Sequence, residues 1–265
     1  MSLVSFNFQS DYLFGNTEIR VILPDKPMNE KPSDYYRSGK KYKVLWLLHG
    51  TFGDSSDWLR KSNIELYASE KDLIVVMPSG MNSNYGNWPT FGLGYNMYDF
   101  LTEELMPLIY GWFPASDKRE DNFIAGLSMG GRGTCVYAFN HPEKFAAAAV
   151  LSASPRDFST MEKTEPSMYA RMMKSVPNYE SLDAFMEGPE NTYDLLDRLV
   201  RENADLPRLY FACGEDDRLF PAFDSFRQHA EAIGLKAEFE TIPGYKHEWR
   251  FWDLTIQHAL AFFGL

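Results

Sequence analysis

The chain has 265 residues, with 26 lysines and arginines against 37 aspartates and glutamates, so its formal net charge is −11 at pH 7. A chain of this length buries a core large enough to need neither disulfides nor a structural metal, and it has only two cysteines, Cys135 and Cys213. The acidic balance and the lack of basic clusters argue against nucleic acid or an anionic membrane surface as a partner. Because no signal pattern and no apolar run of about 20 residues is present, we expect a cytoplasmic protein.

The first predicted element is an antiparallel hairpin, formed by short apolar runs at 3–8 and 17–23 around Gly15 and Asn16. Residues 24–43 are polar and contain three prolines, which predicts a surface connection. Continuously apolar runs, typical of strands buried on both faces, follow at 44–48, 73–77, 123–127, 145–151 and 209–213.

Helical patterns lie between these runs and after them, at 64–69, 95–113, 131–140, 221–233 and 248–263. Parallel strands need crossover connections, which are usually helices. The alternation therefore predicts an α/β fold with a mostly parallel sheet and helices on both faces.

The alternation breaks at residues 154–206, which are rich in methionine and aromatic residues and contain no strand-like run. This composition predicts a helical insertion. Two interpretations are open. The insertion could be a cap with an adaptable methionine surface over a site at the sheet edge, or its methionines could be ordinary core residues of extra helices.

The strongest local motif is Gly126-Leu127-Ser128-Met129-Gly130-Gly131, which is a Gly-x-Ser-x-Gly pattern between a predicted strand and a predicted helix. In this context the serine occupies a sharp turn, and the small flanking residues let the strand and the helix approach closely. The N–H groups at the start of the helix point toward any oxyanion that forms beside the serine. Ser128 is therefore the candidate nucleophile.

A serine becomes nucleophilic when a neighbouring base takes its proton. Of the five histidines, His247 is favoured, because it lies in a loop before the last predicted helix, where a side chain can reach over the sheet edge. The base needs an acid partner, and an acidic cluster follows the strand predicted at 209–213. Asp217 is preferred as the fourth residue of a Gly-x-x-Asp turn, with Asp216 and Glu215 as alternatives.

The glycine-containing segment after the strand predicted at 44–48 suits an oxyanion hole. We expect the N–H of Thr51 to be one donor, with that of Phe52 as the alternative, and the N–H of Met129 to be the second donor. Several aromatic residues on nearby loops are candidates for binding the acyl group, although packing would explain each nearly as well: Phe52, Trp58, Trp88 and Tyr95.

Further motifs accompany the serine motif: His49-Gly50, Asp57-Trp58, Pro78-Ser79-Gly80, His141-Pro142-Glu143-Lys144-Phe145, Cys213-Gly214-Glu215-Asp216-Asp217 and His247-Glu248-Trp249. Together they resemble the esterase D/putative esterase family of α/β-hydrolases, most closely its bacterial tributyrin-esterase-like members. The resemblance runs from about residue 44 to the C-terminus.

This resemblance implies a single α/β-hydrolase domain over residues 1–265, with no cofactor and no metal. Ser128, Asp217 and His247 would form the triad, in the chain order of α/β-hydrolases, and the Thr51 and Met129 amides would form the oxyanion hole. The chain departs from the family pattern at Arg132 and at 87–89, which leaves the substrate preference open.

The activity that follows is hydrolysis of small carboxylic esters through an acyl-enzyme, and we expect short acyl chains as substrates. Among enzymes, the alternatives are a thioesterase acting on S-formylglutathione and a feruloyl-type esterase. Outside enzymes, the alternative is an inactive hydrolase fold that only binds a ligand. The oligomeric state is not indicated.

Overall fold

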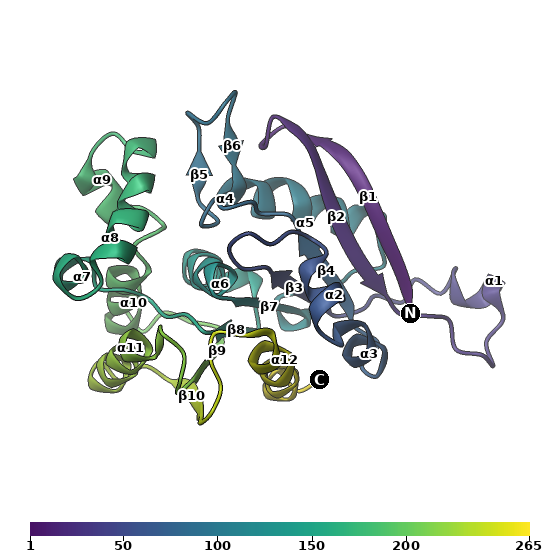
Figure 1. Ribbon diagram of the computed structural model, residues 1–265. Coiled ribbons are helices and arrows are strands. Elements are labelled where there is room, and N and C mark those ends of the chain that lie inside the picture. Colours follow the sequence, from purple (N-terminus) through teal and green to yellow (C-terminus); the bar gives the residue numbers. More distant parts are fainter.

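A twisted sheet of eight strands forms the centre of the molecule, in the order β1-β2-β4-β3-β7-β8-β9-β10 (Figure 1). The computed structural model describes residues 1–265. The strands of this sheet are β1 (Ser2–Ser10), β2 (Gly15–Leu23), β3 (Val44–Leu48), β4 (Ile74–Pro78), β7 (Asn122–Leu127), β8 (Ala147–Leu151), β9 (Arg208–Gly214) and β10 (Ala237–Ile242).

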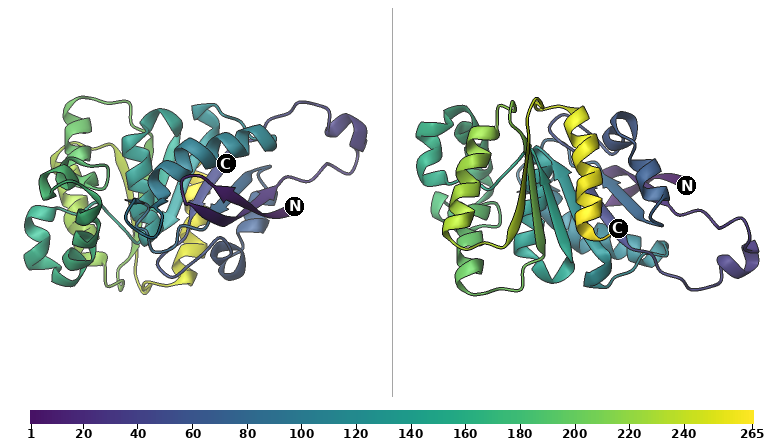
Figure 2. Two further views of the ribbon diagram at one scale, coloured as in Figure 1. Left: turned by 90° about the horizontal axis from the view of Figure 1, so that it is seen from above. Right: turned by 90° about the horizontal axis from the view of Figure 1, so that it is seen from below.

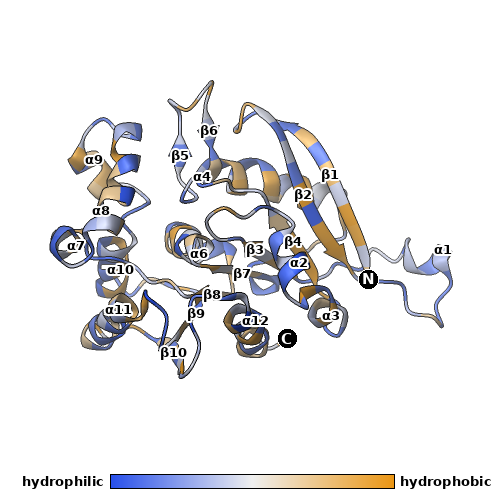
Figure 3. Cartoon of the chain, viewed as in Figure 1, coloured by the Kyte–Doolittle hydropathy of each residue, from blue (hydrophilic) through white to orange (hydrophobic).

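Six neighbouring strands of this sheet pair in parallel, namely β4, β3, β7, β8, β9 and β10. The β1–β2 hairpin joins them through an antiparallel pairing of β2 with β4. The predicted hairpin and the mostly parallel sheet are therefore confirmed. Every residue of β3, β4, β7 and β8 is buried, because helices cover both faces. In contrast, β1 alternates between half-buried and exposed residues, and its colours alternate accordingly in Figure 3.

Helices cover the two faces of the sheet, as the views from above and from below in Figure 2 show. One apolar cluster joins the sheet to α4 (Met97–Asp99), α5 (Met106–Trp112), α6 (Met129–Asn140), α10 (Thr192–Arg201) and α11 (Phe220–Ala232). The other joins it to α2 (Asp57–Lys61), α3 (Ile64–Ser69) and α12 (Trp249–Phe263). No helix is long and apolar enough to cross a lipid bilayer. Another short helix, α1 (Pro32–Tyr35), interrupts the predicted surface connection.

The prediction of one helix over 95–113 needs correction at its start. Tyr95–Asn96 is strand β6, which pairs with β5 (Asn87–Trp88) in a two-stranded hairpin. The helix begins at Met97, and residues 100–105 form a π-helical segment before α5. This segment ends two residues before Pro107, whose missing N–H and bulky ring disfavour regular α-helical bonding in the preceding turn. Two-residue strands leave no apolar run in a sequence, so the hairpin gave no signal.

The insertion at 154–206 is helical, as predicted. It contains α7 (Phe158–Thr164), α8 (Pro166–Met172), a 3₁₀ segment (Met173–Asn178), α9 (Leu182–Glu187) and α10. Phe158, Met161, Met172 and Phe185 form a small apolar cluster of their own there. The helices α7 to α9 thus have packing of their own, at the left of the molecule in Figure 1, whereas α10 packs on the sheet cluster through Leu196.

Candidate functional site

Ser128 stands on the turn between β7 and α6, with φ 54° and ψ −115°. This is a backbone conformation that non-glycine residues rarely adopt and that the surrounding structure must enforce. A Cβ atom at Gly130 would lie 2.5 Å from the carbonyl oxygen of Leu48, and one at Gly126 would collide with the carbonyl of Gly130. The absence of side chains at these two glycines therefore lets β3, β7 and α6 approach closely enough to hold the turn.

A chain of hydrogen bonds starts at the Ser128 hydroxyl. Its Oγ donates to Nε2 of His247 at 3.0 Å, and Nδ1 of His247 donates to Oδ2 of Asp217 at 2.8 Å. The three side chains come from the end of β7, the loop after β10 and the loop after β9. The structure thus brings together the three residues that the sequence predicted.

Asp217 is held as an ionised acceptor. Its side chain has no exposed area, and its Oδ1 accepts the N–H of Leu219 at 2.9 Å. Burial works to raise the pKa of the Asp217 carboxyl, but the hydrogen bonds from His247 and Leu219 outweigh it and lower the pKa below its usual value. The two alternative acid partners make no hydrogen bond to His247. Asp216 is exposed, and Glu215 accepts from the Thr241 hydroxyl instead.

Trp252 supports the histidine from α12. Its ring meets the His247 ring edge to face, with centroids 5.0 Å apart, and its indole Nε1 donates to Ser152 Oγ. A tryptophan in the apolar pattern of the last helix is indistinguishable from a core residue in the sequence, so its contact with His247 could not be predicted.

The segment after β3 places backbone amides beside the serine. The N–H of Phe52 donates to Oδ1 of Asn82 at 2.8 Å, so it is already engaged. The N–H of Thr51 donates to no backbone or side-chain acceptor in the structure, and the N–H of Met129 is the first of α6, where intrahelical acceptors are lacking. Of the two predicted alternatives on this segment, Thr51 is therefore the free donor.

His49 fixes this segment in place. Its buried ring accepts the Gly80 N–H at Nε2, at 2.8 Å, so Nδ1 carries the proton and donates to the Gly50 carbonyl at 2.7 Å. Burial lowers the pKa of His49, which favours the neutral ring that this pattern requires. A side chain that bridges two turns in this way has a structural role.

A cavity of about 430 Å³ opens at Ser128 and His247. The insertion contributes part of its wall: Ser154, Arg156, Phe158, Met168, Arg171, Met172, Glu190 and Thr192. The rest comes from the loops after β3, β4, β7, β8, β9 and β10 and from helices α2, α6 and α12. The insertion therefore forms part of the wall of the cavity that opens at Ser128.

The four aromatic candidates are divided between different places. Phe52 lines the cavity and is 91% exposed. Trp58 is 1% exposed in the core, where its indole donates to the Leu48 carbonyl. Trp88 and Tyr95 line a separate hollow beside the β5–β6 hairpin. The structure therefore does not bring these last three residues to the cavity, because the core and the hairpin hold their rings elsewhere.

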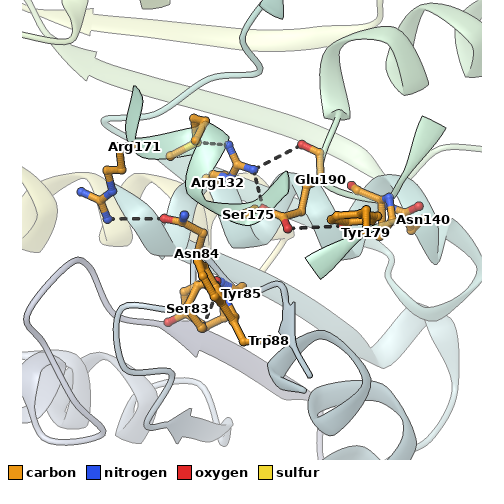
Figure 4. A network of polar contacts seen from close by, with 12 residues as sticks. Ser83, Asn84, Tyr85, Trp88, Arg132, Asn140, Arg171, Ser175, Tyr179 and Glu190 are labelled. Carbon is orange, nitrogen blue, oxygen red and sulfur yellow. Dashed lines mark hydrogen bonds and ion pairs between the residues drawn. The ribbon is translucent and has the colours of Figure 1, made fainter. Parts of the chain in front are cut away.

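Charged side chains in and beside the cavity are largely paired. Glu190, which has no exposed side-chain area, binds Nη2 of Arg132 at 2.8 Å and accepts from Ser175 and Tyr179 (Figure 4). Two further pairs join a cation of the wall to a carboxylate: Lys61 to Asp57 at 2.9 Å and Arg156 to Glu165 at 3.2 Å. The Glu190 contacts tie the insertion to α6, the helix that begins beside Ser128.

Four arginines thus line the cavity: Arg132, Arg156, Arg171 and Arg218. The sequence singled out only the first, as a departure from the family pattern. Arg171 is one basic residue within a methionine-rich segment, and Arg218 follows an acidic cluster, so neither sequence context signals a site. Their convergence depends on how the insertion folds back over the sheet.

Comparisons with known proteins agree with this geometry. Residues 15–263 match the family described as "Putative esterase". The chain is 29% identical to the acetyl esterase of Caldicellulosiruptor saccharolyticus, over 98% of this chain and 97% of that protein. It is 30% identical to two Staphylococcus aureus structures, the fluorophosphonate-binding serine hydrolase FphF and the S-formylglutathione hydrolase FrmB. Each of these matches has a TM-score of 0.80 and covers 99% of this chain and 98% of the other.

Gly130→Ala should loosen the turn at Ser128, because its new Cβ must push α6 away from the backbone of β3. We expect a loss of about 1–3 kcal/mol in unfolding free energy and at least tenfold slower labelling of Ser128 by a fluorophosphonate. Denaturant unfolding and timed mass spectrometry measure the two effects. The control is Gly111→Ala on α5, where a Cβ meets nothing within 4 Å. Equal labelling of the Gly130 variant and wild type would contradict the argument.

Proposed function

The chain belongs to the putative esterase family and is a serine hydrolase of carboxylic esters, and from this premise we propose that Ser128, His247 and Asp217 are its catalytic residues and short-chain acyl esters its substrates. The observation that carries the assignment is the continuous hydrogen-bond chain from Ser128 through His247 to Asp217 at the opening of the cavity.

Each residue then has a distinct part. Ser128 attacks the ester carbonyl while Nε2 of His247 takes its proton and returns it to the leaving alcohol. Asp217 holds the Nδ1 proton of His247 and stabilises the imidazolium. The Thr51 and Met129 amides bind the oxyanion. Water, activated by the same histidine, then releases the acid from the acyl-enzyme.

Short acyl chains are supported by two observations. A relative that matches nearly the whole chain is an acetyl esterase, and the insertion, which we propose to act as a cap within one domain over 1–265, contributes Phe158, Met168 and Met172 to the cavity wall. A wall of bulky apolar side chains favours a small acyl group and restricts a long one. The cytoplasmic location stays a prediction from the sequence.

Hydrolysis of S-formylglutathione is the second candidate. It is supported by the 30% identity to FrmB, an S-formylglutathione hydrolase, and a thioester uses the same nucleophile, base and oxyanion donors. Kinetic comparison of p-nitrophenyl acetate with S-formylglutathione distinguishes the two candidates.

Asp217→Asn should lower kcat for p-nitrophenyl acetate by roughly a thousandfold or more, because an amide favours the wrong tautomer of His247. Asp216→Asn is the matched control, since its exposed side chain makes no hydrogen bond to the histidine, and it should retain most of the activity. Steady-state kinetics measure both variants. The reverse ranking would transfer the acid role to Asp216.

Catalytic efficiency should peak at acetyl to butyryl esters and fall at octanoyl and palmitoyl esters. Each methylene gains about 0.8 kcal/mol of burial only while the cavity has room. Met168→Ala should shift the peak to longer chains, because Met168 lines the cavity. Met161 lies in the same insertion but not on the cavity wall, so Met161→Ala should reduce stability without moving the peak. A wild-type maximum at octanoyl or beyond would indicate an open groove.

A further inference from the structure

Two arginines in the cavity lack a carboxylate partner. Three of the five Lys and Arg cations on the wall are paired with carboxylates, as described above. Arg171 and Arg218 form no salt bridge, and Arg218 makes no hydrogen bond either. The cavity therefore carries an uncompensated positive charge in a protein whose net charge is −11.

Arg171 comes from α8 of the insertion and reaches toward the loop after β3. Its Nη2 donates to the hydroxyl of Thr51 at 2.8 Å and is 3.4 Å from Oδ1 of Asn84 (Figure 4). Both acceptors are neutral. Its Nε and Nη1 have no partner within the protein, so donors of the guanidinium group are left for a molecule in the cavity.

The surroundings of Arg171 make an anion favourable there. Burial lowers the pKa of Arg171 and the neighbouring guanidinium groups of Arg132 and Arg218 lower it further. A half-buried cation that faces other cations gains more from an anionic partner than an exposed one does, because water screens it less. A planar guanidinium also matches a carboxylate with two parallel hydrogen bonds.

Arg171 lies close to the reaction centre. The residue whose hydroxyl it binds, Thr51, offers the backbone N–H proposed for the oxyanion hole. Arg218 directly follows Asp217, so it lines the same cavity from the loop after β9. An ester bound at Ser128 would thus meet one guanidinium from the cap and another from the acid loop.

We propose that Arg171 and Arg218 form an anion subsite, and that the protein prefers esters that carry a carboxylate a few bonds from the scissile carbonyl. The proposal rests on the esterase function above and narrows its substrate class. The carboxylate can belong to the acid part or to the alcohol part of the ester, and the experiment separates these two cases.

Two pairs of esters of matched shape test the subsite. On the acid side, monoethyl succinate is compared with ethyl 4-methylpentanoate. On the alcohol side, 3-acetoxypropanoate is compared with 3-methylbutyl acetate. In each pair a carboxylate replaces an isopropyl group of similar shape. We expect kcat/KM to favour the anionic member at least tenfold in one pair, mainly through a lower KM, as followed by titration of the released acid.

Arg171→Met should reduce this anionic-to-neutral ratio at least tenfold, and Arg171→Lys should retain part of it. Both members of a pair form the same oxyanion, so the ratio cancels any effect of the substitution through Thr51. Arg218→Met should also lower the ratio. Because the side chain of Arg218 is exposed, this variant tests the subsite even if the Arg171 variants fold poorly. Arg201→Met, on the outer surface of α10, is the control and should keep the wild-type ratio.

The subsite is overturned if wild type prefers the anionic ester in neither pair, or if the preference survives in both Arg171→Met and Arg218→Met. In either case, continued hydrolysis of the neutral esters by wild type, and its loss in Ser128→Ala, would leave the proposed esterase function standing. Failure of wild type to hydrolyse any of the four esters would count against both.

Discussion

Three backbone segments meet at Ser128 more closely than side chains would allow. The carbonyls of Leu48 and His49 on the β3 side lie where a Cβ of Gly130 would be, and the carbonyl of Gly130 lies against Gly126. This approach holds Ser128 at a positive φ and aims the start of α6 at the loop after β3. The proposed nucleophile and both proposed oxyanion donors thus depend on one steric constraint, which only glycine satisfies.

The charges of the cavity follow a second constraint. A buried carboxylate needs a cation and further hydrogen-bond donors, and Glu190 obtains these from Arg132 on α6 and from Ser175 and Tyr179 on the insertion. The ion pair with Arg132 also joins the insertion to α6, the helix that begins beside Ser128. Arg156 is paired with Glu165, so Arg171 is the one cation that the insertion places on the cavity wall without a carboxylate partner.

Much of this arrangement could be predicted from local sequence. The strands at 44–48 and 123–127 are continuous apolar runs, and the turn at Ser128 is marked by its glycines. Contacts between residues that are far apart in the sequence could not be predicted in this way. Arg171 and Ser128 are brought to one cavity by the folding of a long insertion, and the β5–β6 hairpin is too short to show a strand pattern. Trp58 is a candidate for the site because it lies on a nearby loop, but core packing explains it nearly as well in the sequence, and the structure buries it in the core.

Hydrolysis of an ester by this protein should pass through an acyl group bound to Ser128. Rapid quenching of the protein with p-nitrophenyl acetate, followed by peptide mass spectrometry, tests it most directly. We expect an initial burst of p-nitrophenolate approaching one equivalent per chain, with one acetyl group on the peptide that contains Ser128 and none in Ser128→Ala. A burst with the acetyl group on another residue, or turnover that persists in Ser128→Ala, would contradict it.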